Sequence, residues 1–270
     1  MAPASPPDRP GTPEPFAGLG LQTLDLRLTD DAVAVLRIDR PDRMNSQTVR
    51  MFTEFGLAAD AIRDSPARAV VLAGAGSRAF CAGFDLAEIG VLADWGVRDF
   101  LAFQETATNG IQAIRYLPVP VIAAVHGGAV GGGLALALAA DIRLVAPSAI
   151  FSAAFVNIGL SLGELGTSYH LSRLVGPGVA AEIGFTGRRV GAEEAVRIGL
   201  ANALVPEDEL LDAALGMARA IAAQPTEAVR IAKRTIQRST ELTSYDAALE
   251  YGARGWALLA DAGARGGSGG

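Results

Sequence analysis

The groups best suited to chemistry in this sequence are backbone amides in two glycine-containing segments. One is FCAGFDL, residues 80–86, and the other, residues 126–134, contains three consecutive glycines before a predicted helix. Glycine lets a ligand approach the backbone because it has no Cβ, and the start of a helix leaves N–H groups without partners. Such an N–H can stabilise an oxyanion, and removing one costs on the order of 10²–10³ in rate. A glycine triplet also serves tight helix packing, so this pattern alone does not identify an enzyme.

Glu164 is the carboxylate whose local sequence points most clearly to chemistry. It follows an apolar run, lies between glycines and begins a predicted helix. A structural role would be to complement the helix dipole, an effect of about 0.3–1 kcal/mol. A functional role would be proton transfer, which positioned carboxylates commonly perform. Cys81 is expected to be a packing residue, because no His or Lys is placed to lower its pKa.

The composition describes a soluble globular protein and argues against several function classes. Of the 270 residues, 50% are hydrophobic and 19% are charged, which suits one large domain. The net charge of −6 argues against binding to nucleic acid or to a membrane surface, because phosphate contacts need clustered Lys and Arg. One cysteine and two histidines exclude an intramolecular disulfide and disfavour a Cys/His zinc site, so we expect no metal and a cytoplasmic location.

The ends of the sequence differ in composition from the rest. Residues 1–20 are rich in proline and lack an apolar core, which predicts a disordered tail. Residues 263–270 are rich in glycine and predict a flexible end. The longest uncharged apolar stretch, residues 127–140, is shorter than the ~20 residues that a membrane span needs.

Short apolar strands alternate with helical patterns in the first part of the chain, which indicates an α/β fold. Strands are predicted at residues 32–38 and 69–74, in VPVIAAV before His126, and from Ile142. Helical spacing follows at residues 47–64 and 97–116 and after the glycine triplet. Further helices are predicted at residues 167–175, 179–185, 192–199, 207–223, 226–239 and 245–260. No internal repeat is apparent in the sequence.

Four segments together resemble the crotonase (enoyl-CoA hydratase/isomerase) superfamily. They are RPDRMNS at residues 40–46, then residues 69–86, 118–151 and 185–206, in the order and at the spacing of that family. The resemblance implies an α/β fold built as a ClpP-like spiral of β-β-α units. It places the core at residues 21–200 and a C-terminal helical region at residues 201–262, which would mediate a homotrimer or a dimer of trimers.

The same resemblance implies an acyl-CoA thioester as the substrate, with coenzyme A as part of it and no separate cofactor. The backbone N–H groups of Ala82 and Gly132 would form an oxyanion hole for the thioester oxygen. Further residues are expected along the acyl and coenzyme channel: Arg43, Cys81, Gly83, Phe84, Asp85, Gly131 and Phe155.

The chain departs from the hydratase pattern of the family at two positions. Hydratases of the family use two glutamates, and the matching positions here are Ala135 and Phe155, neither of which can transfer a proton. Glu164 matches the acidic position of dienoyl-CoA isomerases and of 4-chlorobenzoyl-CoA dehalogenases. A single carboxylate suits isomerisation, because one group can remove a proton and return it at another carbon. We therefore expect an enoyl-CoA isomerase that uses Glu164 as its acid and base.

Other functions on the same scaffold stay open at this point. A hydratase would need a second acid, for which Glu88 and Glu105 are the candidates. A dehalogenase or hydrolase would use Glu164 as base or nucleophile, but the position of its activating histidine matches Gln112 here. A third alternative is a non-catalytic acyl-CoA binding protein that keeps the oxyanion hole without the two hydratase glutamates.

Overall fold

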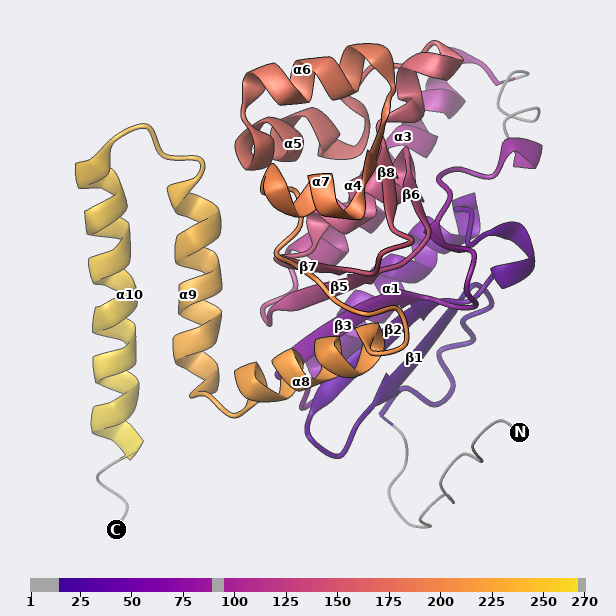
Figure 1. Ribbon diagram of the computed structural model, residues 1–270. Helices are drawn as coiled ribbons and strands as arrows, with labels where there is room; N and C mark the ends of the chain where they lie inside the picture. The colour runs from indigo at the N-terminus through magenta and orange to yellow at the C-terminus, as the bar shows by residue number, and fades with distance from the viewer. Residues whose placement is uncertain (1–14, 89–94, 267–270) are drawn as a thin grey trace.

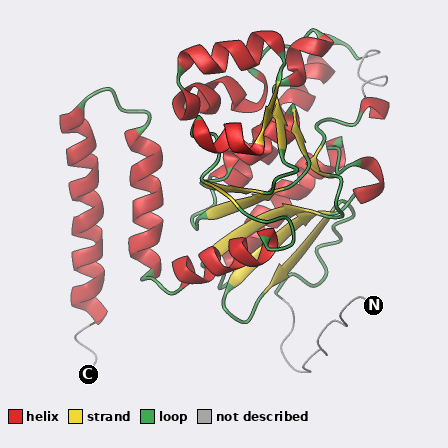
Figure 2. Cartoon of the chain, in the orientation of Figure 1, coloured by secondary structure: helices red, strands yellow, loops and turns green. Residues whose placement is uncertain are grey.

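Two β-sheets form the centre of the computed structural model, which describes residues 15–88 and 95–266 (Figure 2). The first sheet has the order β1 (Leu24–Leu28), β2 (Val33–Ile38), β3 (Ala69–Gly74), β5 (Val121–Val125), β7 (Ile142–Val145) and β10 (Ala203–Leu204). The second has the order β4 (Ala79–Cys81), β6 (Gly128–Val130), β8 (Ile150–Ser152) and β9 (Arg189–Gly191). Neighbouring strands are parallel except in the pairs β1–β2 and β8–β9.

Helices surround these sheets (Figure 1). The α-helices are α1 (Val49–Asp64), α3 (Val97–Arg115), α4 (Gly132–Ala139), α5 (Thr167–Val175), α6 (Pro177–Thr186), α7 (Ala192–Arg197), α8 (Leu210–Ala222), α9 (Thr226–Ser239) and α10 (Tyr245–Gly266). The described residues also form the 3-10 helices η1 (Pro41–Arg43), η2 (Ala154–Ile158) and η3 (Glu164–Gly166). No helix in the described parts of the chain is long and apolar enough to span a membrane.

The chain repeats one path through the two sheets. It runs from β3 to β4 and on to α3, then from β5 to β6 and α4, and then from β7 to β8 and the short helices before α5. Each round adds one parallel strand to each sheet, so β3, β5 and β7 are neighbours, as are β4, β6 and β8. This arrangement is the spiral of β-β-α units expected from the resemblance.

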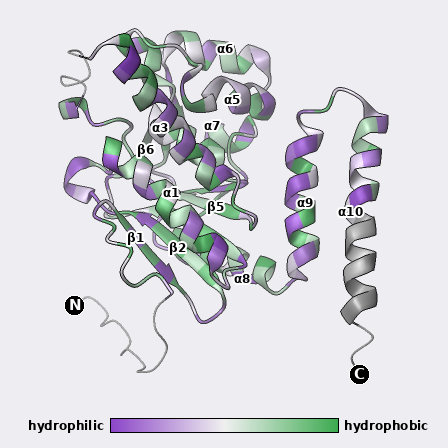
Figure 3. Cartoon of the chain, turned by 180° about the vertical axis from the view of Figure 1, so that it is seen from behind, coloured by the Kyte–Doolittle hydropathy of each residue, from purple (hydrophilic) through white to green (hydrophobic). Residues whose placement is uncertain are grey.

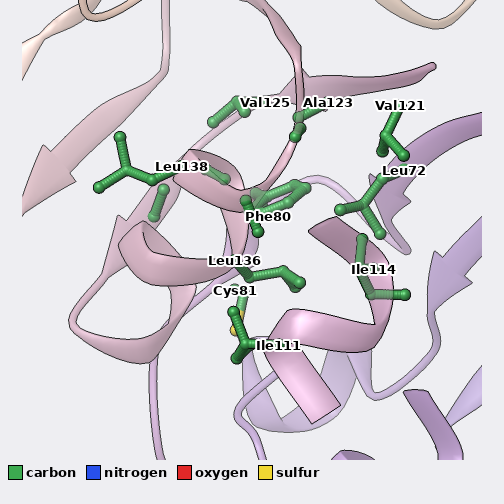
Figure 4. Packing of buried hydrophobic residues seen from close by; sticks show 14 of the residues in the cluster. Leu72, Phe80, Cys81, Ile111, Ile114, Val121, Ala123, Val125, Leu136 and Leu138 are labelled. Carbon is green, nitrogen blue, oxygen red and sulfur yellow. The ribbon is translucent and has the colours of Figure 1, made fainter. Parts of the chain in front are cut away.

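The central strands of the first sheet are buried on both faces, as parallel strands covered by helices usually are. In β3, Val70 and Leu72 face one hydrophobic cluster, and Val71 and Ala73 face the other, because side chains alternate along a strand. The larger cluster joins this sheet to α1, α3 and α4, and part of it is shown in Figure 4. The smaller cluster lies under α8.

Helix α1 shows why these residues form a helix at this place. Thr48 is its N-cap, and the Thr48 hydroxyl accepts a hydrogen bond from the Met51 N–H at 3.1 Å, which satisfies one free donor of the first turn. Its buried apolar residues recur every three or four positions: Met51, Phe52, Phe55, Ala58, Ala59 and Ile62. The helix therefore presents one apolar face to the core.

The packed core extends further in both directions than the predicted boundaries. Past residue 200, β10 pairs with β7, and α8 buries Leu210 and Ala214 against the first sheet. Within the predicted tail, Phe16 is buried in the larger cluster. The amphipathic pattern of α8 could not reveal which surface it covers. Residues 1–14 and 267–270, where most of the predicted tail and half of the predicted end fall, lie outside the described residues.

Helices α9 and α10 form an arm beside the body of the molecule (Figure 1). Lys233, near the middle of α9, joins the arm to the body, with its Nζ 2.8 Å from the Asp141 carboxylate and 2.9 Å from the Val119 carbonyl oxygen. Gln237 adds a hydrogen bond from its Nε2 to the Arg115 carbonyl oxygen at 3.1 Å. Beyond these anchors the arm leaves large apolar side chains exposed, among them Tyr245 at 76% and Leu249 at 54% exposure.

Candidate active site

A cavity of about 650 Å³ lies where the two glycine-containing loops meet α3 and the 3-10 helices η2 and η3. Most of its lining is apolar, and the polar side chains that reach it come from Gln47, Gln104 and Glu164. Its full lining among the described residues is Gln47, Phe52, Ala82, Gly83, Phe84, Leu86, Phe100, Phe103, Gln104, Ala107, Val130, Gly131, Gly132, Ala154, Phe155, Ile158, Leu160, Glu164 and Leu165.

The structure corrects one member of the predicted pair of amide donors. The Ala82 N–H donates a hydrogen bond to the Met44 carbonyl oxygen at 3.0 Å and is therefore not available to a ligand. Two residues further along, the Phe84 N–H makes no hydrogen bond to any described residue, and neither does the Gly132 N–H at the start of α4. A Cβ built on Gly83 would lie 3.5 Å from the Gly132 nitrogen, so the two loops are in contact. Phe84 and Gly132 thus each contribute to the cavity wall a backbone N–H that has no hydrogen-bond partner among the described residues.

The loop of residues 40–46 explains why the Ala82 amide is engaged. Asn45 adopts a left-handed backbone conformation with φ 55°, which asparagine tolerates better than most residues. Its side-chain Nδ2 donates to the carbonyl oxygens of Ala75 and Ala79 at 2.9 and 2.7 Å. The loop is thereby fixed beside β4, where the preceding residue, Met44, directs its carbonyl oxygen at Ala82.

The glycine triplet is required by close approach between the loops. A Cβ on Gly133 would collide with the Cys81 carbonyl oxygen, and one on Gly132 would collide with the Gln47 side chain. Glycine at these two positions lets α4 begin directly against the other loop, where its first N–H groups face the cavity. The packing role considered for the triplet is therefore fulfilled, and two of its glycines, Gly131 and Gly132, also line the cavity.

Glu164 lines the cavity from η3, as predicted for the candidate acid and base. Its Oε2 accepts a hydrogen bond from Gln104 Nε2 at 2.8 Å, which leaves Oε1 free to face a ligand. Gln104 lies on α3 and was not identified from the sequence, where it is one polar residue among several on an amphipathic helix. Its contact with Glu164 depends on how α3 packs against η3.

The two other candidate acids lie away from the cavity. The Glu88 carboxylate accepts a hydrogen bond from the Val49 N–H at 3.0 Å and so caps the start of α1. Glu105 is exposed on α3 and does not line the cavity. Among the described residues, Glu164 is thus the only acidic residue of the cavity lining. Ala135, at the first hydratase glutamate position, is buried within α4.

Four of the remaining predicted binding residues line the cavity, and three do not. Gly83, Phe84, Gly131 and Phe155 belong to the wall. The other three, Arg43, Cys81 and Asp85, are absent from that lining.

Each of these three residues has a different environment. Arg43 is exposed on η1. Cys81 is packed in the core near Ile111 and Leu136 (Figure 4), and burial raises the pKa of its thiol to about 12. The packing role predicted for Cys81 agrees with this environment. Its predicted place along the acyl and coenzyme channel does not, because Cys81 is absent from the cavity lining.

Asp85 holds its own loop in place. Its carboxylate accepts hydrogen bonds from the Arg40 guanidinium at 3.0 Å, the Ser46 hydroxyl at 3.2 Å and the Ala87 N–H at 3.1 Å. Burial alone would raise the pKa of Asp85, but these hydrogen bonds outweigh it and hold the pKa below its usual value. The carboxylate therefore joins the 40–46 loop to the loop that carries Phe84.

Aromatic rings form one end of the cavity. Phe84 stacks on Phe52 with ring centroids 6.2 Å apart and meets Phe103 at 5.1 Å. Phe100 and Trp95 pack on the far side of Phe103 at 6.3 and 5.9 Å. These rings exclude water, which strengthens hydrogen bonds and charges inside the cavity.

The two histidines lie outside this lining. His126 follows β5 and is half-buried, with a hydrogen bond to the backbone of Gly76. His170 lies on α5 and lines a separate cavity of about 210 Å³ together with Arg115, Tyr169 and Glu241.

The sequence matches the model of the enoyl-CoA hydratase/isomerase family over residues 29–254. This chain belongs to that family. The match spans the two glycine-containing loops, Glu164 and most of the arm, and it confirms the resemblance to the crotonase superfamily. The protein is accordingly an enzyme of the hydratase/isomerase type.

Similar proteins include both hydratases and an isomerase. A Mycobacterium bovis protein described as a probable enoyl-CoA hydratase is 42% identical over 223 residues, which cover 81% of this chain and 78% of that protein. The enoyl-CoA hydratase of Bacillus anthracis superimposes with a TM-score of 0.82 at 31% identity, covering 87% of this chain and 90% of that one. A monofunctional enoyl-CoA isomerase of M. smegmatis gives a TM-score of 0.73 at 36% identity, covering 85% and 99%.

Proposed function

We propose that this enzyme moves a carbon–carbon double bond in an enoyl-CoA thioester, with Glu164 as the proton carrier. One observation carries the proposal. Glu164 is the only acid in the described cavity lining, and it shares that cavity with the two free N–H groups of Phe84 and Gly132. A thioester substrate and an isomerase are also named for the family and for one of the similar structures. No cofactor is needed beyond the coenzyme A portion of the substrate.

The proposed reaction moves one proton between two carbons. A carboxylate oxygen of Glu164 takes a proton from C2 of a 3-enoyl thioester, and the electrons of that C–H bond move toward the carbonyl oxygen. The N–H groups of Phe84 and Gly132 stabilise the resulting dienolate oxygen. The Glu164 carboxyl then returns the proton to C4, which leaves the conjugated 2-enoyl thioester. Atoms and charge balance without water.

Hydration is less favoured because the second acid that it needs is missing from the described lining. Ala135 and Phe155 stand at the positions of the two hydratase glutamates, and Glu88 and Glu105 lie away from the cavity. The aromatic end of the cavity also disfavours a bound water molecule, which needs two to four polar partners. In this setting Glu164 acts alone, and Gln104 fixes its orientation through the 2.8 Å hydrogen bond.

Replacing Glu164 by glutamine tests the proposal directly. Glu164→Gln removes the proton carrier while keeping the shape of the side chain, so we expect isomerisation to fall by about 10²–10⁴-fold. The measurement is the conversion of 3-enoyl-CoA substrates of several chain lengths into conjugated 2-enoyl-CoA, followed by absorbance. Glu105→Gln is the control, since Glu105 is exposed on α3 and does not line the cavity.

Other outcomes of the same assay would replace the proposal. Water addition to 2-enoyl-CoA by the unchanged enzyme, in the absence of isomerisation, would identify a hydratase. Release of free acid or halide from acyl- or haloaryl-CoA would identify a hydrolase or dehalogenase. Tight acyl-CoA binding without turnover, equal in the enzyme and in Glu164→Gln, would identify a binding protein.

A further inference from the structure

Gln47 connects the two loops that carry the free amide donors. It is fully buried at the end of the 40–46 loop, one residue before the N-cap of α1. Its backbone N–H donates to the Gly83 carbonyl oxygen at 2.7 Å, and its carbonyl oxygen accepts from the Asp85 N–H at 2.8 Å. These two bonds hold the residues on either side of Phe84 and so fix the plane of the peptide that presents the Phe84 N–H.

The side chain of Gln47 reaches the other loop. Its Nε2 donates a hydrogen bond to the Gly132 carbonyl oxygen at 3.0 Å, in a fully buried position. The carboxamide lies against the Cα of Gly132, because a Cβ at that position would collide with Gln47 Oε1. One residue therefore contacts both donor-bearing segments, with its backbone on one and its side chain on the other.

Burial of the Gln47 carboxamide at this position lowers the stability of the fold. Gln47 Oε1 is buried and has no hydrogen-bond partner among the described residues. An unpaired buried acceptor destabilises a fold, and such exceptions in a native structure call for an explanation. Methionine or leucine would fill similar space without leaving an acceptor unpaired. The hydrogen bond from Gln47 Nε2 to the Gly132 carbonyl oxygen explains why glutamine stands at this position.

We infer that Gln47 is a positioning residue that sets the separation and orientation of the Phe84 and Gly132 N–H groups. This inference rests on the proposed use of those two groups as an oxyanion hole. Stabilisation of an oxyanion depends on donors that are already in place, so a small shift of Gly132 weakens it. Although Gln47 borders the cavity, the role assigned to it passes through the two amides rather than through the reacting carbons.

The variant Gln47→Met tests the side-chain link alone, because methionine keeps the backbone N–H and carbonyl oxygen that make the other two hydrogen bonds. We expect kcat for isomerisation to fall by about tenfold or more, while KM changes by less than about threefold. The melting temperature should stay equal or rise, because the unpaired acceptor is removed. A purely structural role would instead lower the melting temperature and leave kcat of the folded enzyme unchanged.

A spectroscopic measurement separates this inference from the proposed reaction. Butyryl-CoA labelled with ¹³C at the thioester carbonyl has no double bond to move, so its bound carbonyl stretch can be recorded by infrared difference spectroscopy. We expect the enzyme to shift this band to lower wavenumber, and Gln47→Met to reduce the shift. Gln104→Met is the matched control, since Gln104 contacts Glu164 and neither amide: turnover should fall while the band keeps its shift.

Three outcomes would contradict the proposed role of Gln47. An equal band shift and equal kcat in the enzyme and in Gln47→Met would overturn the role of Gln47 and leave the oxyanion hole in place. Absence of any shift in the enzyme itself would contradict the oxyanion hole and the inference with it. If Gln47→Met does not fold, Gln47→Leu replaces it, and failure of both to fold would assign Gln47 to the fold rather than to the donors.

Discussion

At the scale of single residues, His170 shows how the surroundings of a side chain set its proton affinity. Burial beside α3 and α4, followed by the positive charges of Arg115, Arg143 and Arg173, lowers the pKa of His170 from 6.5 to about 4. The imidazole is therefore neutral in the folded protein at pH values where the unfolded chain already binds a proton.

This difference predicts a pH dependence of stability. Between pH 6.5 and about 4 the unfolded state binds more protons at this residue than the folded state, so stability falls as the pH is lowered through that window. His170→Gln should remove this part of the loss. The measurement is urea denaturation of both proteins at several pH values from 7 to 4. The difference between their free energies of unfolding is compared at each pH, so that the contribution of shared carboxylates cancels. Parallel curves would show that His170 does not contribute.

Individual residues of the site could be predicted to different degrees. Glu164 was singled out from its residue type and its glycine neighbours, which are visible along the chain, whereas the choice of Gly132 among three glycines came from the family resemblance. The free amide was misplaced at Ala82, because which N–H is free depends on the Met44 carbonyl oxygen in a distant loop. Gln104 and Gln47 were missed for the same reason, since both act through contacts made only after folding.

At the scale of elements, the start of α4 is where the two loops come closest. Gly133→Ala would place a Cβ against the Cys81 carbonyl oxygen, which is backbone in the core and cannot move aside without shifting β4. We expect a loss of about 1–3 kcal/mol of stability and of most activity.

Gly56→Ala is the matched control for this substitution. Gly56 lies inside α1 with open space around its Cα, so alanine should stabilise the protein by about 0.5–1 kcal/mol. Chemical denaturation and the isomerisation assay check both variants. Equal stability of the two alanine variants would contradict the close approach of the loops.

The length of an element decided how well it was predicted. Strand β3 and helices α5 and α9 have the predicted bounds, since buried runs and amphipathic spacing over several turns leave few alternatives. The strands of the second sheet have three residues each, too few for a pattern, and they fell in segments for which no strand was predicted. The β-β-α repeat was invisible for this reason, because half of its strands carry no signal of their own.

At the scale of the whole molecule, the arm of α9 and α10 has apolar surface with no neighbour in the described chain. Hydrophobic residues occur among the polar ones along α9 (Figure 3), and Ile236 is 66% exposed. Exposed apolar side chains on an element that stands beside the body indicate a surface for association. The arm is therefore the surface on which we expect association, and the homotrimer or dimer of trimers remains an expectation from the family resemblance.

Analytical ultracentrifugation tests this expectation. We predict a mass of three or six chains for the protein, and dissociation when Tyr245 and Leu249 are both replaced by glutamate, because two charges cannot be buried without partners. Leu211→Glu is the control, since Leu211 is 41% exposed on α8 rather than on the arm. A monomer at all concentrations would show that the arm has another role.

Phe84 contributes to the site in two ways at once. Its amide belongs to the proposed oxyanion hole, and its ring packs against Phe52 and Phe103 at one end of the cavity. An acyl tail wide enough to displace the packed ring would therefore strain the backbone that carries this N–H. Under the proposed reaction, we expect such a tail to lower kcat more than it raises KM.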